Sequence, residues 1–214
     1  MQWERARTDE QKEQRISEIV AATERLYEKY DFDEITFVLI AEEANFTRSN
    51  LYKYFTTKEE IFLEFMRNDI NIYVKNLVKE FSKKKKYSVD QFVATWVKVL
   101  VKNKRLLNLF GILFSSLEKN CTFEALTEFK LGTKKDLFSV VELLCTVFPS
   151  LDQEKAKEFF YLQFALAVGL FQMTNHSELQ KKVLEQPELR EFNLDFETYY
   201  KRSIEHLING VLGS

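Results

Sequence analysis

The chain has 214 residues, of which 45% are hydrophobic and 30% are charged, and its formal net charge is −2. This composition indicates a globular protein with a sizeable core, and the slightly acidic balance excludes a general electrostatic attraction to nucleic acid. Five glycines and two prolines leave few turn or strand signals, which favours a mostly helical fold.

The ends and the apolar runs indicate a cytoplasmic protein. The N-terminal stretch MQWERARTDEQKEQR carries charges where an export signal needs an apolar segment. The most apolar run, 159–173, is too short to span a bilayer and contains two glutamines, so we expect a core or interface helix there. Cys121 and Cys145 match no metal spacing and are expected to be reduced thiols.

The first helix is expected at about 10–30, where apolar residues recur at helical period on one face. Thr36 is the expected N-cap of a short second helix that ends near Ala44. Asn45 follows at a position that suits a left-handed backbone, because its short amide side chain tolerates positive φ.

Thr47 is the expected N-cap of a third short helix that runs to about Phe55. The stretch TTKEE then predicts a capping box, with Thr57 as the cap and Glu60 three residues later. This box would open a fourth helix at about 58–80, which keeps an apolar stripe for several turns and links the N-terminal region to the rest of the chain.

The remaining chain predicts a bundle of further helices. We expect them at about 88–103, 106–117, 122–148, 152–174 and 195–210. The lysine-rich run at 82–87 is expected to be a solvated loop, and the polar stretch at 175–193 to be partly helical. The helix at 106–117 is apolar on almost every side, which is typical of a helix in the middle of a bundle.

One stretch, NFTRSNLYKYFTTKEE at 45–60, holds no acid until its last two positions. Residues 1–60 contain nine Lys/Arg and fourteen Asp/Glu, a net −5, whereas 44–58 contains three basic residues and no acid, a net +3. Two short helices joined by a tight turn form a helix-turn-helix, whose second helix enters the DNA major groove. The positions that must pack in such a motif are suitably apolar or small here, at Ile40, Ala41, Ala44, Phe46, Leu51 and Tyr54.

At these residues the sequence TFVLIAEEANFTRSNLYKYFTTKEE resembles the TetR/AcrR family of bacterial transcription regulators. The positions that match the family pattern are Thr36, Ile40, Ala41, Ala44, Thr47, Leu51, Tyr52, Tyr54, Phe55, Lys58 and Glu59. The resemblance covers about 12–72, and beyond it the likeness rests on helix number and length. Asn45 replaces the usual turn glycine, and Val38 and Leu39 stand where the family has polar residues.

The resemblance implies an all-α fold with two domains. An N-terminal three-helix helix-turn-helix DNA-binding domain is expected at 10–60, with the helix-turn-helix itself at about 36–55. A C-terminal helical bundle for ligand binding and dimerisation is expected at 61–214.

The resemblance also implies roles for individual residues. Arg48, Ser49 and Asn50 are the candidate base readers, because they project from the front of the third helix. Phosphate contacts are expected from the two threonine caps and from tyrosine and lysine side chains, with Tyr54 more in the core. The full DNA-binding set is Thr36, Thr47, Arg48, Ser49, Asn50, Tyr52, Lys53, Tyr54 and Lys58.

Twenty phenylalanines, most of them after residue 58, could line an apolar cavity in the bundle or simply fill its core. The candidate effector pocket is Trp96, Phe110, Phe114, Phe129, Phe164 and Phe171, with Asn108, Ser115, Ser116, Gln163 or Gln172 as orienting polar groups. The candidate dimer interface is Phe160, Ala167, Val168, Tyr200, Ile204, Leu207 and Val211. A two-fold dimer would present its recognition helices to successive major grooves, about 34–36 Å apart.

The expected function is that of a sequence-specific DNA-binding regulator, a repressor that a small hydrophobic or aromatic effector releases from a palindromic operator. The alternative is a helical small-molecule or lipid-binding protein that does not bind DNA. Catalysis is not expected, because His176 and His206 have no second ligand at zinc spacing and no phosphate loop or nucleophile elbow occurs. No metal or cofactor is expected either.

Overall fold

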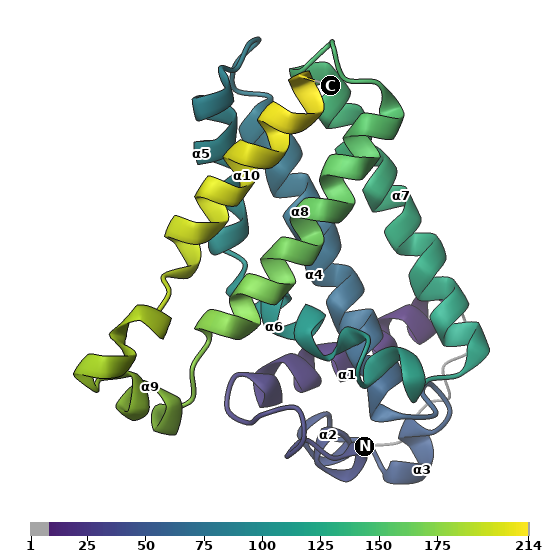
Figure 1. Cartoon of the computed structure of the whole chain (residues 1–214). Coiled ribbons are helices and arrows are strands. Elements are labelled where there is room, and N and C mark those ends of the chain that lie inside the picture. Colours follow the sequence, from purple (N-terminus) through teal and green to yellow (C-terminus); the bar gives the residue numbers. More distant parts are fainter. Residues whose placement is uncertain (1–8, 214) are drawn as a thin grey trace. The chain divides into compact units, whose positions relative to one another are not determined.

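The structure is a computed structural model that describes residues 9–213. Across this range every regular element is a helix, which confirms the all-α fold (Figure 1). The chain forms two compact units: unit 1 combines Met1–Asp69 with Leu113–Gly132, and unit 2 combines Ile70–Ile112 with Thr133–Ser214. The sequence did not indicate that the short segment 113–132 belongs with the N-terminal helices.

Unit 1 is built around the N-terminal helices. They are α1 (Asp9–Tyr27), α2 (Phe37–Glu43), α3 (Arg48–Leu51) and the first half of α4 (Lys58–Phe81). The unit also contains two later elements, the 3-10 turn η1 (Leu117–Lys119) and the start of α7 (Phe123–Val147). The ring of Tyr27 on α1 lies edge-on to Phe62 on α4, with 5.4 Å between the ring centroids. An ion pair of 2.7 Å between Arg25 Nε and Glu43 Oε1 joins α1 to α2.

The local signals around the two short helices are confirmed. The hydroxyl of Thr36 accepts the backbone N–H of Leu39 at 3.1 Å and caps α2. The hydroxyl of Thr47 accepts the backbone N–H of Asn50 at 3.2 Å and caps α3. Asn45 adopts the left-handed conformation, with φ of 58°.

α3 ends at Leu51, earlier than the predicted Phe55. The backbone N–H of Lys53 bonds to the carbonyl of Asn50, and that of Tyr54 to the carbonyl of Leu51. These bonds span three residues instead of four, so the chain tightens into turns after the first helical turn. The predicted fourth helix is confirmed as α4.

Unit 2 is a bundle of longer helices. It contains the second half of α4, α5 (Val89–Val101), α6 (Lys104–Leu113), the rest of α7, α8 (Gln153–Thr174), α9 (Glu178–Leu184), the 3-10 turn η2 (Pro187–Phe192) and α10 (Phe196–Gly213). The side chains of Ser88 and Asp152 cap α5 and α8. α6 ends at Leu113 instead of continuing to about 117, and the chain then passes through η1.

The core of unit 2 contains a polar cluster among aromatic rings. Trp96 on α5 donates its indole N–H to the hydroxyl of Tyr200 on α10 at 3.1 Å and to Oε1 of Gln163 on α8 at 3.3 Å. The hydroxyl of Tyr200 in turn donates to Oε1 of Gln163 at 2.6 Å. Phe92 and Phe159 pack against the indole ring, and all five side chains are buried. Three helices are therefore joined at one buried point.

Candidate nucleic-acid interface

The front of α3 presents basic and polar side chains to solvent. Arg48 and Ser49 are exposed, Asn50 is half-buried, and Lys53 is exposed in the turn that follows. No acidic side chain occurs between residues 44 and 58. Because phosphates repel carboxylates, this is the part of the N-terminal region that can approach a polyanion.

Arg48 is held on the surface of α3 by a tyrosine. Its Nη2 donates to the hydroxyl of Tyr52 at 3.1 Å, and its guanidinium carbon lies 5.6 Å from the centroid of that ring. The Tyr52 ring stacks on Phe37 of α2, with 4.6 Å between centroids. Phe37 was not among the predicted site residues, because nothing in the sequence indicates that a residue of the first helix of the motif supports the side chains of the second.

Lys58 is half-buried at the start of α4 and has partners within its own unit. Its ammonium donates to the backbone carbonyls of Phe32 and Ile35, at 2.8 Å each, and lies 4.1 Å from the centroid of the Phe32 ring. These contacts fasten the start of α4 to the connection between α1 and α2. Two of the three ammonium N–H groups are donated to these carbonyls, and the contact of Lys58 with a phosphate stays a prediction.

Glu60 replaces the predicted capping box with a wider network. The backbone N–H of Glu60 bonds to the Thr57 hydroxyl at 3.3 Å, as the box requires. Its carboxylate, however, accepts the backbone N–H of Thr56 at 2.6 Å, and it also accepts both the N–H (3.1 Å) and the hydroxyl (2.7 Å) of Thr122. Thr122 directly precedes α7, so one carboxylate joins the starts of α4 and α7.

The surroundings of Glu60 keep it ionised. The side chain is only 6% exposed, and this burial by itself would raise its pKa. The hydrogen bonds from Thr56, Thr122 and Thr57 outweigh the burial and hold the pKa of the carboxyl below its ordinary value of 4.5. A buried carboxylate with this many donors has a structural role in the unit that contains the helix-turn-helix.

The remaining predicted DNA-binding residues lie where the patterns placed them. Thr36 and Thr47 are exposed at the starts of α2 and α3. Tyr54 is half-buried, with its ring edge-on to Phe46 at 6.0 Å between centroids, as expected for a core residue. Their contact with DNA stays a prediction.

Family comparisons identify the class of protein. The pattern described as "Bacterial regulatory proteins, tetR family" matches residues 19–65, and "Tetracyclin repressor-like, C-terminal domain" matches residues 68–214. The chain belongs to the tetR family. It is therefore a DNA-binding transcriptional regulator, and the helix-turn-helix of unit 1 is its DNA-binding element.

Individual relatives of this tetR-family protein are distant. An uncharacterized HTH-type transcriptional regulator of Haemophilus influenzae is 27% identical over 79 residues, which is 37% of this chain and 42% of the relative. The match thus spans less than half of that relative.

Solved structures share the fold. The fatty acid degradation regulator FadR from Bacillus halodurans aligns over 90% of this chain and 94% of its own, with 14% identity and a TM-score of 0.56. A tetR-family regulator from Mesorhizobium loti aligns over 94% and 96%, with 12% identity and a TM-score of 0.57. At these identities the likeness is one of architecture.

The residues of the predicted effector pocket are divided between the two units. Phe114 and Phe129 belong to unit 1, whereas Trp96, Phe110, Phe164 and Phe171 belong to unit 2. Trp96 and Phe171 are buried, while Phe110 and Phe164 are half-buried and lie edge-on at 4.4 Å between centroids. The orienting group Gln163 is part of the buried polar cluster.

The predicted dimer residues divide by burial. Ala167, Tyr200, Ile204 and Val211 are buried inside unit 2, whereas Phe160, Val168 and Leu207 are half-buried. The four buried side chains fill the core of a single protomer, so they have no surface left for a partner.

Between residues 9 and 213 no helix is long and apolar enough to cross a bilayer, and no cluster of three His, Cys, Asp or Glu side chains suits a metal ion.

Proposed function

We propose that this tetR-family protein is a cytoplasmic repressor that binds a palindromic operator as a homodimer. A small hydrophobic or aromatic effector, bound by unit 2, would lower its affinity for the operator. The observation that carries the proposal is the front of α3, where Arg48, Ser49 and Lys53 are exposed and no acid lies nearby in the sequence of an otherwise acidic N-terminal region.

The side chains on α3 divide into base readers and backbone contacts. Arg48 suits guanine and Asn50 suits adenine, and each good base contact is worth about 1–3 kcal/mol. The cap hydroxyls of Thr36 and Thr47 accept backbone N–H groups, so their own O–H groups can donate to phosphates. Lys53 would pair with a phosphate as a point charge, and Tyr52 would orient Arg48.

The test begins with selection of binding sequences from a random DNA pool, which reveals an operator of any sequence. We expect the enriched sequence to contain a two-fold repeat with half-sites about one helical turn apart. Enrichment of no sequence, or of a sequence without a repeat, would contradict the proposal.

Fluorescence anisotropy on the selected DNA then tests the residues. Arg48→Ala should weaken binding about 5- to 150-fold, because a base contact is lost. Lys53→Ala should weaken binding to all sequences and lower the slope of log affinity against log salt by about one. Lys83→Ala, in the exposed loop at 82–87, is the matched control and should change neither quantity.

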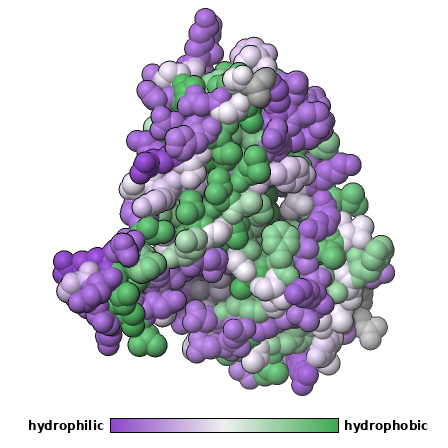
Figure 2. Space-filling model, in the orientation of Figure 1, coloured by the Kyte–Doolittle hydropathy of each residue, from purple (hydrophilic) through white to green (hydrophobic). Residues whose placement is uncertain are grey.

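The proposed dimer contact is the exposed face of α8. Figure 2 shows hydrophobic side chains gathered in a band over this helix. The exposed residues on this face are Leu162, Ala165, Gly169 and Met173, and Tyr199 of α10 is exposed as well. Alanine and glycine at 165 and 169 leave room for a close approach by a second helix. These residues replace the four buried ones in our dimer proposal.

Light scattering after gel filtration tests this contact. Leu162→Asp should convert a dimer to monomer, because it places a charge in a desolvated contact. Leu179→Asp is the matched control, since Leu179 is even more exposed but belongs to a different helix, α9. Equal dimer fractions in both variants would exclude the α8 face.

Effector release rests on differential binding to two states of the protein. In unit 2 the half-buried pair Phe110 and Phe164 is the part of the predicted pocket that a ligand could still reach. Titration of apolar and aromatic compounds into the protein–operator complex should lower anisotropy for those that bind unit 2. A compound proven to bind unit 2 without any effect on operator affinity would count against this coupling.

A further inference from the structure

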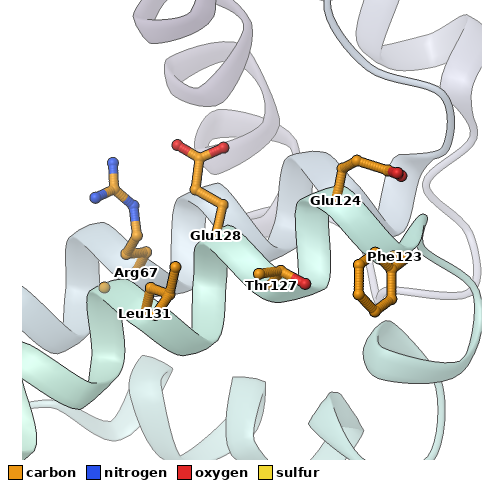
Figure 3. A pocket seen from close by; sticks show the side chains of 7 residues that line it. Arg67, Phe123, Glu124, Thr127, Glu128 and Leu131 are labelled. Atoms are coloured by element: carbon orange, nitrogen blue, oxygen red, sulfur yellow. The ribbon is translucent and has the colours of Figure 1, made fainter.

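The first two turns of α7 carry an apolar row that nothing in the described chain covers. Phe123 is 80% exposed and Leu131 is 64% exposed, and Thr127 lies between them on the same helical face. A hollow of about 490 Å³ lies along this row, and Figure 3 shows the side chains that line it. They are Arg67 of α4 and Phe123, Glu124, Thr127, Glu128, Leu131 and Gly132 of α7, all within unit 1.

The inner wall of this groove is set by a close approach of α4 and α7. A methyl group added to Gly132 would lie 3.1 Å from Cδ of Arg67, so the glycine lets the aliphatic stem of Arg67 lie against α7. The guanidinium itself is neutralised by Glu64, which accepts from Nη2 at 2.7 Å and from Nε at 3.1 Å. The wall is therefore apolar and carries no net charge.

The outer edge of the groove is negative. Glu124 and Glu128 are exposed, lie one helical turn apart, and have no ion-pair partner within residues 9–213. Glu124 lies in the first turn of α7, where the helix dipole favours an acid, and Glu128 adds a second negative charge one turn later. Figure 3 shows the two glutamates on one edge of α7 and the ring of Phe123 on the other. Lys130, the nearest base on α7, is already paired with Glu118.

We propose that this groove binds a small amphipathic cation, an apolar body that carries a protonated or quaternary amine. The body would cover Phe123 and Leu131, and the amine would lie on the side of the two carboxylates. The hollow is open to solvent, so it suits a small ligand that keeps part of its surface in water. An anion is disfavoured there because the two carboxylates repel it. The site does not involve the front of α3 or the effector region of unit 2.

Three compounds of similar length distinguish the contribution of ligand charge to binding from that of ligand shape. They are 4-phenylbutylamine, 4-phenylbutanol and 4-phenylbutanoate. They would be titrated into the full-length protein at pH 7, and binding would be followed by NMR chemical shifts. We expect saturable binding of the amine, about fivefold tighter than that of the alcohol, and weaker binding of the acid. No saturable amine binding, or equal binding of amine and alcohol, would overturn the proposal.

Substitutions locate the site. The double variant Glu124→Gln/Glu128→Gln keeps the shape of the groove and should make the affinities of amine and alcohol equal. Phe123→Ala should weaken both compounds about threefold. Glu188→Gln/Glu191→Gln, an exposed pair in η2, is the matched control and should leave amine binding unchanged.

Two further measurements keep the test decisive. Circular dichroism checks that each variant is folded, which is expected because the substituted side chains are exposed. If Phe123→Ala changed the oligomeric state while the amine failed to bind the parent, the face would belong to a contact between copies, and the proposal would be wrong. None of these readouts uses DNA, so the outcome is independent of the proposed function.

Discussion

The helix-turn-helix of unit 1 and the polar cluster of unit 2 are held together by contacts of different range. In unit 1 the caps join residues three positions apart, as Thr36 does with Leu39 and Thr47 with Asn50. In unit 2 the indole of Trp96 bonds to side chains 67 and 104 positions away. Short-range contacts leave a pattern in the sequence, whereas long-range contacts depend on the completed fold.

The two kinds of contact also differ in energy. A cap contributes about 1 kcal/mol, and its loss is partly compensated by water at the exposed helix end. A buried hydrogen-bond network cannot draw on water, so the loss of one member leaves its partners unsatisfied in the core. We therefore expect the cluster to be far more sensitive to substitution than the caps.

The largest effect is expected at Tyr200. Tyr200→Ala should lower the free energy of unfolding by about 3–5 kcal/mol, because it removes a fully buried ring and leaves a cavity. Tyr200→Phe keeps the ring and should cost about 1–2 kcal/mol, for the lost hydrogen bonds alone. Urea unfolding followed by circular dichroism measures both. Equal losses in the two variants would show that the polar bonds, not the packing, dominate the cluster.

Glu60 is an exception to the division between short-range contacts in unit 1 and long-range contacts in unit 2, because its carboxylate bonds to the distant Thr122 inside unit 1. Glu60→Gln should lower the free energy of unfolding by about 2 kcal/mol at neutral pH, since an amide cannot accept from all the donors that face the carboxylate. The folded pKa of Glu60 lies below 4.5, so its contribution is complete above that pH and is lost as the pH falls through the folded value.

The difference between parent and Glu60→Gln should therefore be constant from pH 7 to about 5 and shrink below that range. Urea unfolding of both proteins across pH 7 to about 3 measures it, and the other acidic groups cancel in the comparison. A difference that stays the same at the acid end would mean that the carboxylate charge is not what stabilises the site.

A smaller loss is expected at the caps. Thr36→Ala and Thr47→Ala should each cost about 1 kcal/mol, because a backbone N–H loses its acceptor. Thr47→Ser retains the hydroxyl and is the matched control. A loss with serine as large as with alanine would point to the methyl group of the threonine instead of the cap.

The smallest effects are expected at Asn45. Its φ of 58° is costly for most residues, so Asn45→Ala should cost about 1 kcal/mol. Asn45→Gly should change the stability by less than about 0.5 kcal/mol, because glycine has no such cost but loses more backbone entropy. Thermal unfolding midpoints compare the two. Equal midpoints for alanine and glycine would mean that the turn relaxes to a different conformation.

What could be predicted from the sequence follows the same division. The caps at Thr36 and Thr47 and the left-handed Asn45 were predictable, because each depends on residues within three positions. Lys58 was assigned to phosphate on resemblance, yet it bonds to carbonyls of residues 26 and 23 positions earlier. Nothing in the local sequence shows where those carbonyls point.

Helical stripes identify an apolar face but not the element that covers it. The stripe of α10 contains Tyr200 and Ile204, which were expected to meet a second copy and instead lie in the core of their own protomer. The residues left on the exposed face of α8, among them Gly169 and Ala165, are small and gave a weaker signal. Burial against a neighbour of the same chain is decided by the arrangement of the bundle, which periodicity does not encode.

The bond between Glu60 and Thr122 has a consequence for anyone who builds hybrid regulators from this chain. The two family patterns meet between residues 65 and 68, which suggests a natural cut point. A transplant that ends there would leave out Leu113–Gly132, although this segment belongs to the same compact unit. The grafted Glu60 would then face a foreign loop without its donor, so a working hybrid has to carry both pieces of the chain together.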